Sequence, residues 1–374
     1  MRDRPPDTSV PLHRPWIGDA ERQALARVLA RGELAGNGEE CRELESELGR
    51  RLAVSHALAV SSATHALEIA MHLLDLAGGE VVLPSFTFPS VGNAVVRAGG
   101  RPVFCEVREP DLNIDLDHAL SLVGPRTRAL VVTHYAGHPV DPAASPVPVV
   151  EDAAHALGSR LGGRSCGTLG RFGCLSFHAT KNVVAGEGGA LLVSDPGAAR
   201  AARIFREKGT NRDEFLAGEV AFYSWVGLGS SLVLPELGAA LARAQLARLD
   251  DITRRRRAVA ARYEAGLGEL ERRGELRVVR CVEGESCHHV FAVLVAPERR
   301  ARLLARLRQL GVGAASHFVP LHASPFGRAV GRAPALPRTE RLAASLVRLP
   351  IFPTLAEAEQ ERVIDAVESA CRTS

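Results

Sequence analysis

Short apolar runs alternate with stretches of helical periodicity along the first half of the chain. The strand candidates are residues 56–62, 81–85, 101–107, 128–135, 147–152, 173–177 and 189–195. These runs are rich in Val and Leu and lack polar alternation, which is typical of strands buried on both faces. Between the first two, residues 64–76 carry apolar side chains at helical spacing until Gly78. This alternation predicts an α/β fold with a mostly parallel sheet and helices on both of its faces.

The pattern changes after residue 232. Residues 234–270 have the periodicity of one long helix, followed by a strand over 288–296 and helices over 297–310 and near 355–371. A chain of 374 residues also exceeds the usual size of a single core. We therefore predict a loose N-terminal tail over 1–12, a large domain over 13–245 and a smaller α+β domain over 246–374.

Charge and composition exclude several classes of protein. The net charge of +3 gives no field that would attract nucleic acid. No apolar run reaches the ~18 residues of a membrane span, and residues 1–15 lack the apolar core of a signal peptide. Seven cysteines without a CxxC pair are typical of reduced thiols in a cytoplasm. We expect a soluble cytoplasmic protein without a metal site, and we interpret the basic run 254–257 as a solvated helix face.

Lysine is nearly absent from this arginine-rich chain. Of its 46 lysine and arginine residues, only Lys181 and Lys208 are lysines. A lysine amine can lose its proton and form a Schiff base with a carbonyl group, whereas a guanidinium stays protonated. Lys208 falls in the last turn of a predicted helix, just before Gly209, where any cation suits the helix dipole. Lys181 follows a predicted buried strand in a polar, glycine-rich loop, where α/β proteins display reactive groups. We interpret it as a covalent catalyst.

A Schiff-base lysine usually serves pyridoxal 5′-phosphate (PLP), which has further needs. Its ring nitrogen needs a carboxylate, which Asp152 offers at a strand end, although a helix cap is the alternative for this residue. Its phosphate needs free N–H groups, which Ala63 and Thr64 offer at a helix start, where a plain cap is the alternative. Phe88 would cover the ring, or else belong to the core. No GxxxxGK, GxGxxG or HExxH motif points to another cofactor.

Several motifs resemble one family. SFHATKN and GEGGALLVSD, with EDAAH, VSSATHAL and PSFTF before them, are similar to the DegT/DnrJ/EryC1/StrS group of PLP-dependent nucleotide-sugar aminotransferases. The likeness extends over nearly the whole chain, and the motifs occur in the family's order. It implies the aspartate-aminotransferase fold (PLP fold type I) and a homodimer whose active sites are shared between the subunits.

The resemblance implies a role for each motif residue. Lys181 looks like the Schiff-base lysine and proton shuttle, and Asp152 like the partner of the ring nitrogen. His155 is expected to contact the ring or its 3-oxygen, and His178 to lie beside the site as a further catalytic residue. Phe88 matches the aromatic residue that stacks on the ring. The expected phosphate ligands are Ala63 (Gly in the family), Thr64, Ser176 and, from the other subunit, Ser231, where many relatives have Asn.

Two longer segments narrow the resemblance. REKGTNRDEFLAGEVAFYSWVGLGSS (206–231) and HFVPLHASPFG (317–327) resemble transaminases that make dTDP-4-amino-4,6-dideoxygalactose from dTDP-4-keto-6-deoxyglucose, with glutamate as the amino donor. The residues expected to line the sugar-nucleotide cleft are Asn211, Arg212, His317 and His322; for the two histidines, an ordinary polar edge is the alternative. Transamination at C3, a different nucleotide sugar and a non-catalytic binding protein of the same fold stay open as alternatives.

Overall fold

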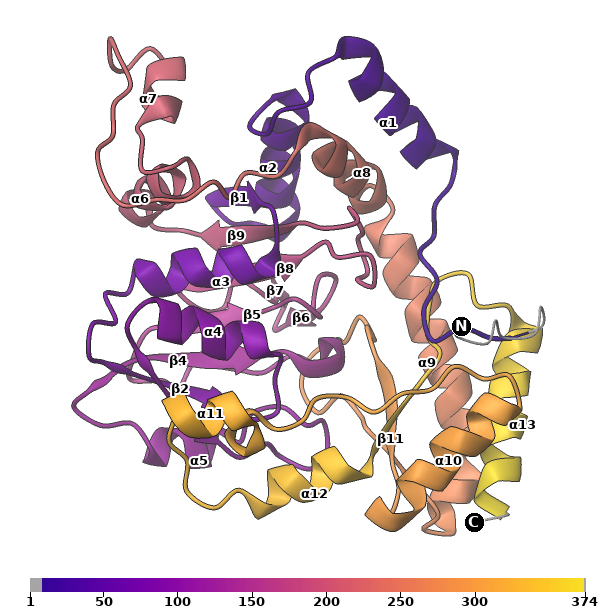
Figure 1. Cartoon of the computed structure of the whole chain (residues 1–374). Coiled ribbons are helices and arrows are strands. Elements are labelled where there is room, and N and C mark those ends of the chain that lie inside the picture. The colour runs from indigo at the N-terminus through magenta and orange to yellow at the C-terminus, as the bar shows by residue number, and fades with distance from the viewer. Residues whose placement is uncertain (1–8, 373–374) are drawn as a thin grey trace.

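The computed structural model describes residues 9–372 (Figure 1). Its centre is a seven-stranded sheet in the order β1-β9-β8-β5-β4-β2-β3. The strands are β1 (His56–Val60), β2 (Glu80–Pro84), β3 (Arg101–Cys105), β4 (Thr127–Thr133), β5 (Val149–Asp152), β8 (Phe172–Ser176) and β9 (Gly189–Val193). All seven strand candidates of this half are confirmed. β9 runs antiparallel to both of its neighbours and the other pairs are parallel, which confirms the mostly parallel α/β fold.

Helices cover both faces of this sheet. One face packs against α3 (Ala63–His72), α4 (Pro89–Arg97) and α6 (Pro196–Arg206), of which α3 and α4 lie side by side in Figure 1. The other face packs against α2 (Glu39–Leu52), α5 (Leu116–Ser121) and α8 (Glu236–Leu246). In β1, for example, Leu58 and Ala59 point to opposite faces and both are buried. This two-sided burial explains why the strands read as continuous apolar runs.

A second core forms beyond α8. Here the antiparallel strands β10 (Arg277–Val278), β11 (Phe291–Leu294) and β12 (Leu346–Leu349) pack against α9 (Leu249–Arg272), α10 (Pro297–Gln309) and α13 (Glu357–Arg372). The strand and the two helices predicted for this region are therefore confirmed. Leu321 and Leu336, however, join the core of the seven-stranded sheet. The division of the chain at 245/246 stays a prediction.

The remaining elements lie outside these sheets and the helices that cover them. They are α1 (Asp19–Arg31), η1 (Tyr135–Gly137), β6 (Arg160–Leu161), β7 (Arg164–Ser165), α7 (Arg212–Leu216), η2 (Leu321–Ala323), α11 (Pro325–Val330) and α12 (Pro337–Ser345). Among the described residues, the longest helices are too polar or too short to cross a membrane.

The single helix expected over 234–270 is in fact two helices. α8 ends at Leu246 and α9 begins at Leu249. Between them, Arg248 has φ −105° and ψ 10°, and its guanidinium donates to the carbonyl of Trp16 and the carboxylate of Glu21. Acidic side chains occupy the first turn of α9, a helix-start signal that the apolar periodicity alone does not reveal.

Two expectations about basic residues, the run 254–257 and Lys208, are wrong. Arg256 is only 1% exposed and donates to three backbone carbonyl groups of the C-terminal part, so the run 254–257 is not a solvated face throughout. α6 ends at Arg206, and Lys208 lies beyond the helix with φ 64°, rather than in its last turn.

The predicted tail over 1–12 is packed where it is described. Val10 is buried and forms a parallel bridge with Val312, so the chain is fixed to the second core from this residue onward. Residues 1–8 lie outside the described residues, and the prediction for them is not addressed by the structure.

Candidate active site

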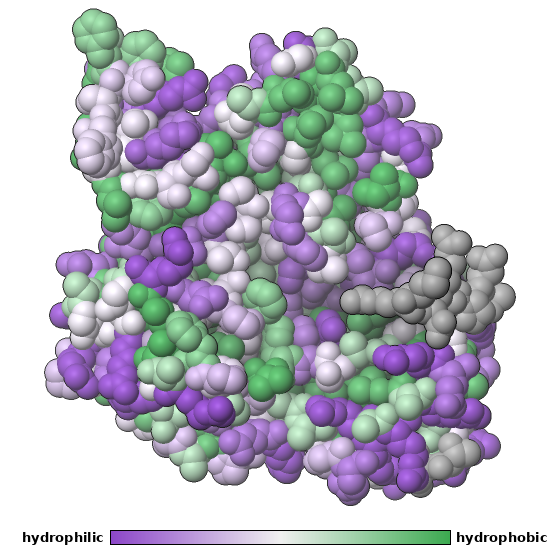
Figure 2. Space-filling view, viewed as in Figure 1, coloured by the Kyte–Doolittle hydropathy of each residue, from purple (hydrophilic) through white to green (hydrophobic). Residues whose placement is uncertain are grey.

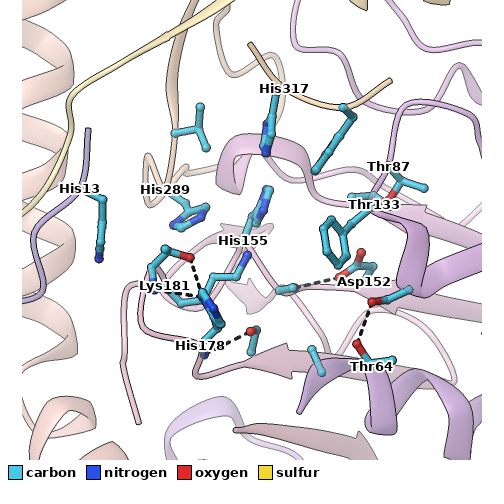
Figure 3. A pocket seen from close by; sticks show the side chains of 18 of the residues that line it. His13, Thr64, Thr87, Thr133, Asp152, His155, His178, Lys181, His289 and His317 are labelled. Atoms are coloured by element: carbon cyan, nitrogen blue, oxygen red, sulfur yellow. Dashed lines mark hydrogen bonds between the residues drawn. The ribbon is translucent and has the colours of Figure 1, made fainter. Parts of the chain in front are cut away.

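A cavity of about 700 Å³ lies at the carboxyl ends of the parallel strands, next to β12 (Figure 3). Nine of the sequence-predicted site residues line it: Ala63, Thr64, Phe88, Asp152, His155, Ser176, His178, Lys181 and His317. Ser231, Asn211, Arg212 and His322 do not. Thr133, Asp152 and Ser176, which line the cavity, are the last residues of β4, β5 and β8, and parallel sheets form their sites at that edge.

Lys181 lies in the loop after β8. Its backbone N–H donates to the carbonyl of His178 at 2.8 Å, and the side chain lines the cavity. Burial lowers the pKa of Lys181 to about 8, while the carboxylate of Asp152 acts in the opposite direction. Roughly a tenth of the amine is therefore unprotonated at pH 7. Only this form can attack a carbonyl carbon or accept a proton.

Asp152 is the last residue of β5 and is 6% exposed. Its Oδ1 accepts the N–H of Ala154 at 3.1 Å, and no described residue forms a salt bridge with it. Burial raises the pKa of this carboxyl, whereas the N–H of Ala154 and the charge of Lys181 oppose that shift. A positively charged N–H donor placed beside the carboxylate would stabilise its ionised form.

The first turn of α3 presents free N–H groups to the cavity. Ser62 caps the helix by accepting the N–H of His65 at 3.2 Å. The N–H groups of Ala63 and Thr64 donate to no described residue. The hydroxyls of Thr64 and Ser90 are hydrogen-bonded at 2.7 Å and lie at the same end of the cavity. Free N–H groups at the positive end of a helix form an anion site.

A glycine holds this helix start close to the sheet. A Cβ at Gly189 would lie 2.5 Å from the nitrogen of Ala63 and 2.6 Å from the oxygen of Leu175, so β8, β9 and α3 can meet only at a residue without a side chain. Ser176 ends β8 beside this junction and lines the cavity, with the N–H of His178 at 3.4 Å from its hydroxyl.

Imidazole rings form another wall of the cavity. The ring of His155 lies 4.5 Å from that of His289 and 5.9 Å from that of His317, with which it is stacked. Tyr135 is hydrogen-bonded to Nδ1 of His317 at 2.9 Å. Nδ1 of His155 is buried and has no hydrogen-bond partner among residues 9–372. Burial lowers the pKa of all three histidines, that of His317 to about 2, so they add polarity without charge.

Phe88 stands at the mouth of the cavity. The residue precedes α4 and is 56% exposed, so it is not the core residue that the alternative interpretation required. Its ring lies 6.0 Å from that of Phe318, which also lines the cavity. Phe88 therefore offers an aromatic surface to a bound molecule.

His178 lines the cavity but is held by its own loop. Its Nδ1 is 2.9 Å from the hydroxyl of Thr180, and its Nε2 is 3.7 Å from Glu187. The side chain is 44% exposed. It lies closer to solvent than Lys181 does.

His322 has two partners away from the cavity. Its Nδ1 lies 2.6 Å from the hydroxyl of Ser85, and its Nε2 lies 3.0 Å from Glu340. These bonds connect η2 to the end of β2 and to α12. They agree with the alternative interpretation of His322 as part of an ordinary polar edge.

Asn211, Arg212 and Ser231 lie on one projecting segment, residues 207–231, which we call the arm. Figure 1 shows the arm with α7 standing away from the body of the molecule. Asn211 accepts the N–H of Ser224 at 2.8 Å, and Ser231 pairs with Glu207 across the base of the arm. Within a single chain, the arm does not reach the cavity.

Several lining residues were not predicted from the sequence. Ser90 lies in the PSFTFPS motif, and this motif was the signal that could have identified it as a site residue. His289 and His13 belong to no motif, although His13 lies 2.7 Å from the carbonyl of Ala179, next to Lys181. Arg348 is one arginine among many, and nothing in its local sequence marks it.

Comparison with known proteins decides the family. The model of the DegT/DnrJ/EryC1/StrS aminotransferase family matches residues 15–368. The chain belongs to this family. It is similar to the aminotransferase TlmJ from Streptoalloteichus hindustanus, with 34% identity, a TM-score of 0.90 and 97% of this chain and 99% of that one covered. It is also similar to DesV from S. venezuelae, with 33% identity, a TM-score of 0.86 and 94% of each chain covered.

Membership confirms the fold, the class of enzyme and the cofactor. Spr1654 from Streptococcus pneumoniae, solved in its PLP form, has the same fold at 22% identity, with a TM-score of 0.88 over 98% of this chain and 99% of that one. The chain is a PLP-dependent aminotransferase of fold type I, since enzymes of the DegT/DnrJ/EryC1/StrS family use PLP. The non-catalytic alternative is therefore set aside.

The described residues fit PLP. The cavity offers an amine at Lys181, a buried carboxylate with acceptor capacity at Asp152 and free N–H groups at the start of α3. The unpartnered Nδ1 of His155 is a further polar atom that a bound ring could satisfy. In Figure 3 Lys181, His155 and Asp152 border one space, with Thr64 below Asp152. The separate role of each residue stays a prediction.

Proposed function

We propose that this aminotransferase transfers an amino group from glutamate to the C4 ketone of dTDP-4-keto-6-deoxyglucose, with the galacto product favoured. The observation that carries the proposal is the resemblance of segments 206–231 and 317–327 to transaminases of that reaction. His317, from the second segment, lines the cavity, which supports a role for this segment at the substrate. A C3 ketone or a different nucleotide sugar is the alternative within the family.

Each of the cavity residues would have its own role in the reaction. Bound PLP would supply an aldehyde that takes up an amine and a ring that accepts electrons. Lys181 would hold the cofactor and then move a proton from Cα of the donor, since burial keeps part of its amine neutral. Asp152 would hold a proton on the ring nitrogen, and the start of α3 would bind the phosphate. Two half-reactions in one cavity predict ping-pong kinetics.

We also propose that the enzyme is a cytoplasmic homodimer with shared active sites. The arm exposes large apolar side chains, including Phe222 at 83%, Trp225 at 80% and Leu228 at 69%. Figure 2 shows hydrophobic surface over this projection. Burial against a second copy would remove this surface from water and bring Ser231, Asn211 and Arg212 to the partner's cavity. The seven free cysteines support a reducing compartment.

Shared sites have a direct test. Lys181→Ala removes the amine, and Ser231→Glu would place a carboxylate against the phosphate bound by the partner. Each homodimer should be inactive. In an equal mixture of co-expressed chains, half of the dimers are mixed and each holds one intact site, so about a quarter of the wild-type activity should return. Activity of the Ser231→Glu homodimer, or none in the mixture, would contradict shared sites.

The substrate assignment requires a product analysis. Purified enzyme is incubated with glutamate and either dTDP-4-keto-6-deoxyglucose or the corresponding 3-keto sugar nucleotide. We expect turnover of the 4-keto compound and NMR couplings of an axial amine at C4, the galacto configuration. Turnover of the 3-keto compound alone would move the reaction to C3.

A further inference from the structure

The loop after β8 presents Lys181 to the cavity from a tight turn, residues 178–181, which we call the lysine turn. The N–H of Lys181 donates to the carbonyl of His178 at 2.8 Å and closes this turn. Of the hydrogen bonds that the turn forms in the described part of the chain, all but one stay between the end of β8 and the start of β9. The exception is the carbonyl of Ala179, which lies 2.7 Å from Nε2 of His13. His13 thus holds the lysine turn from a different segment of the chain.

His13 belongs to the N-terminal segment, and residues 10–16 of this segment, which we call the strap, are fixed on both sides of it. Before His13, Val10 is buried and its N–H donates to a carbonyl of the second core at 2.8 Å. After His13, the carbonyl of Trp16 accepts an N–H of Gln245 at 2.7 Å. Figure 3 shows His13 on a ribbon of its own at the edge of the site. The imidazole is therefore held in place independently of the lysine turn.

The contact with Ala179 determines which nitrogen of His13 carries a proton. A carbonyl oxygen can only accept a hydrogen bond, so Nε2 is the donor. Burial lowers the pKa of His13 to about 4, although the bond to Ala179 opposes that shift, and the ring is neutral at pH 7. A neutral imidazole has a single N–H, and that of His13 is used on the lysine turn. His13 therefore brings no charge to the cavity, although it is one of the lining residues.

Lysine needs such support because its side chain is long and flexible. The amine has to occupy the same place in each of the two half-reactions, and a displacement of about 1 Å can slow a reaction about 100-fold. The carbonyl of Ala179 belongs to a peptide group in the middle of the lysine turn. If that peptide group rotates, the backbone of Lys181 and its whole side chain move with it. A hydrogen bond that fixes this carbonyl thus also fixes the start of the lysine side chain.

We propose that His13 is a positioning residue, which holds Lys181 in its reactive place through the carbonyl of Ala179. The proposal rests on the role that we propose for Lys181, and it goes beyond that role by giving the strap a task in catalysis. His13 acts on the lysine turn and not on a substrate, so it serves both half-reactions alike. An imidazole whose one N–H is already engaged fits this role better than that of a substrate ligand.

Two substitutions separate the hydrogen bond from the shape of the side chain. His13→Phe keeps a ring without a donor, and His13→Gln keeps an N–H the same number of bonds from the backbone. Cofactor absorbance follows the reaction of the PLP-loaded enzyme with glutamate and, separately, with the amino-sugar nucleotide product. In His13→Phe both maximal rate constants should fall by about 10- to 100-fold, whereas both half-saturating concentrations change by less than about 3-fold. His13→Gln should recover most of both rates.

Controls keep the comparison independent of folding. His13→Leu, a second variant without a donor, should behave as His13→Phe does, and it preserves the test if the larger ring disturbs the fold. His72→Phe, at the exposed end of α3, should leave both half-reactions unchanged. Wild-type rates in both donor-free variants, or no recovery in His13→Gln, would overturn the proposal. Slowing with only one of the two substrates would also overturn it, since His13 would then contact that substrate.

An isotope effect tests whether the loss falls on the proton that Lys181 moves. With glutamate deuterated at Cα, the slowing caused by deuterium should be at least as large in His13→Phe as in the wild type, because proton transfer is the slowed step. A smaller isotope effect would mean that another step has become limiting, which contradicts a role through Lys181.

The roles of Lys181 and His13 fail in different ways. A Lys181→Ala variant that still turns over would contradict both roles. A Lys181 that carries the cofactor, together with wild-type rates in the donor-free variants, would remove His13 alone. A wild type that reacts with glutamate but not with the amino sugar would contradict the proposed substrate. In that case the glutamate rates, the recovery in His13→Gln and the isotope effect still decide on His13.

Discussion

Burial shifts the pKa values of the two central side chains of the cavity in opposite directions. It lowers the pKa of Lys181 and raises that of Asp152, because each charged form loses contact with water. Each charge in turn stabilises the other. Burial thus keeps part of the Lys181 amine neutral, which proton transfer requires, while the charge of Lys181 opposes the effect of burial on the pKa of Asp152.

Removal of the carboxylate should impair catalysis far more than folding. In Asp152→Asn the ring nitrogen loses the group that keeps it protonated, so kcat should fall by at least about 100-fold, or about 2.7 kcal/mol. Steady-state kinetics measures the loss. Asp250→Asn, whose side chain is 92% exposed on α9, is the matched control and should keep wild-type activity. Near-normal kcat in Asp152→Asn would remove Asp152 from the mechanism.

The lowered pKa of Lys181 predicts how the cofactor-free enzyme recaptures PLP. The unprotonated amine reacts and the protonated amine does not, so the rate should rise with pH and level off above about 8. Stopped-flow absorbance between pH 6 and 9 measures it. In Asp152→Asn the midpoint should move to lower pH, since the charge that raises the pKa of Lys181 is gone. A midpoint near the ordinary lysine value of 10.5 would show that burial does not act on this amine.

At the scale of single residues, the sequence predicts those site residues that are rare in the chain or lie in motifs. Lys181 stands out because lysine is nearly absent, and Asp152 because it ends a strand. Arg348 and His289 reach the cavity only through the folding of the second core onto the first. Neither their spacing nor their residue type carries that information.

At the scale of the elements, the junction of β8, β9 and the start of α3 positions the residues that we expect to bind the phosphate. Apolar runs predict these elements well, because strands buried on both faces leave a continuous pattern. The direction of β9 does not follow from its composition, since antiparallel and parallel buried strands look alike. The break between α8 and α9 was missed for a related reason. Apolar periodicity continues through it, and only polar contacts of Arg248 with the N-terminal segment fix the turn.

Gly189→Ala tests this junction. The added Cβ would meet the nitrogen of Ala63 and the oxygen of Leu175, so β9 or α3 must shift. We expect a loss of about 1–3 kcal/mol in the free energy of unfolding and weaker PLP binding, measured by denaturant titration and cofactor titration. Gly124→Ala, where a Cβ meets nothing within 4 Å, is the control. An unchanged PLP affinity in Gly189→Ala would separate the junction from the cofactor.

At the scale of the whole molecule, one chain forms the cavity but leaves its arm without a binding partner. The arm holds three residues expected at the substrate and phosphate, and its apolar side chains are exposed. The homodimer that we propose would account for both facts. The sequence provided this expectation through resemblance alone, because composition carries no record of a subunit interface.

Trp225→Asp should therefore weaken self-association. It places a charge at a side chain that is 80% exposed in one chain and is buried in the proposed dimer. We expect the dimer dissociation constant to rise by at least about 10-fold, in the range of an interface hot spot, by analytical ultracentrifugation. Val282→Asp, at a 52% exposed position outside the arm, should leave it unchanged. A wild type that is monomeric at all concentrations would contradict the proposal.

The most direct measurement is reduction of the holoenzyme with borohydride followed by peptide mapping. Reduction makes the bond between the cofactor and a lysine permanent, and the chain offers only Lys181 and Lys208. The account predicts the pyridoxyl group on the peptide that contains Lys181, and on no other. A modified Lys208, or no modified lysine, would contradict it.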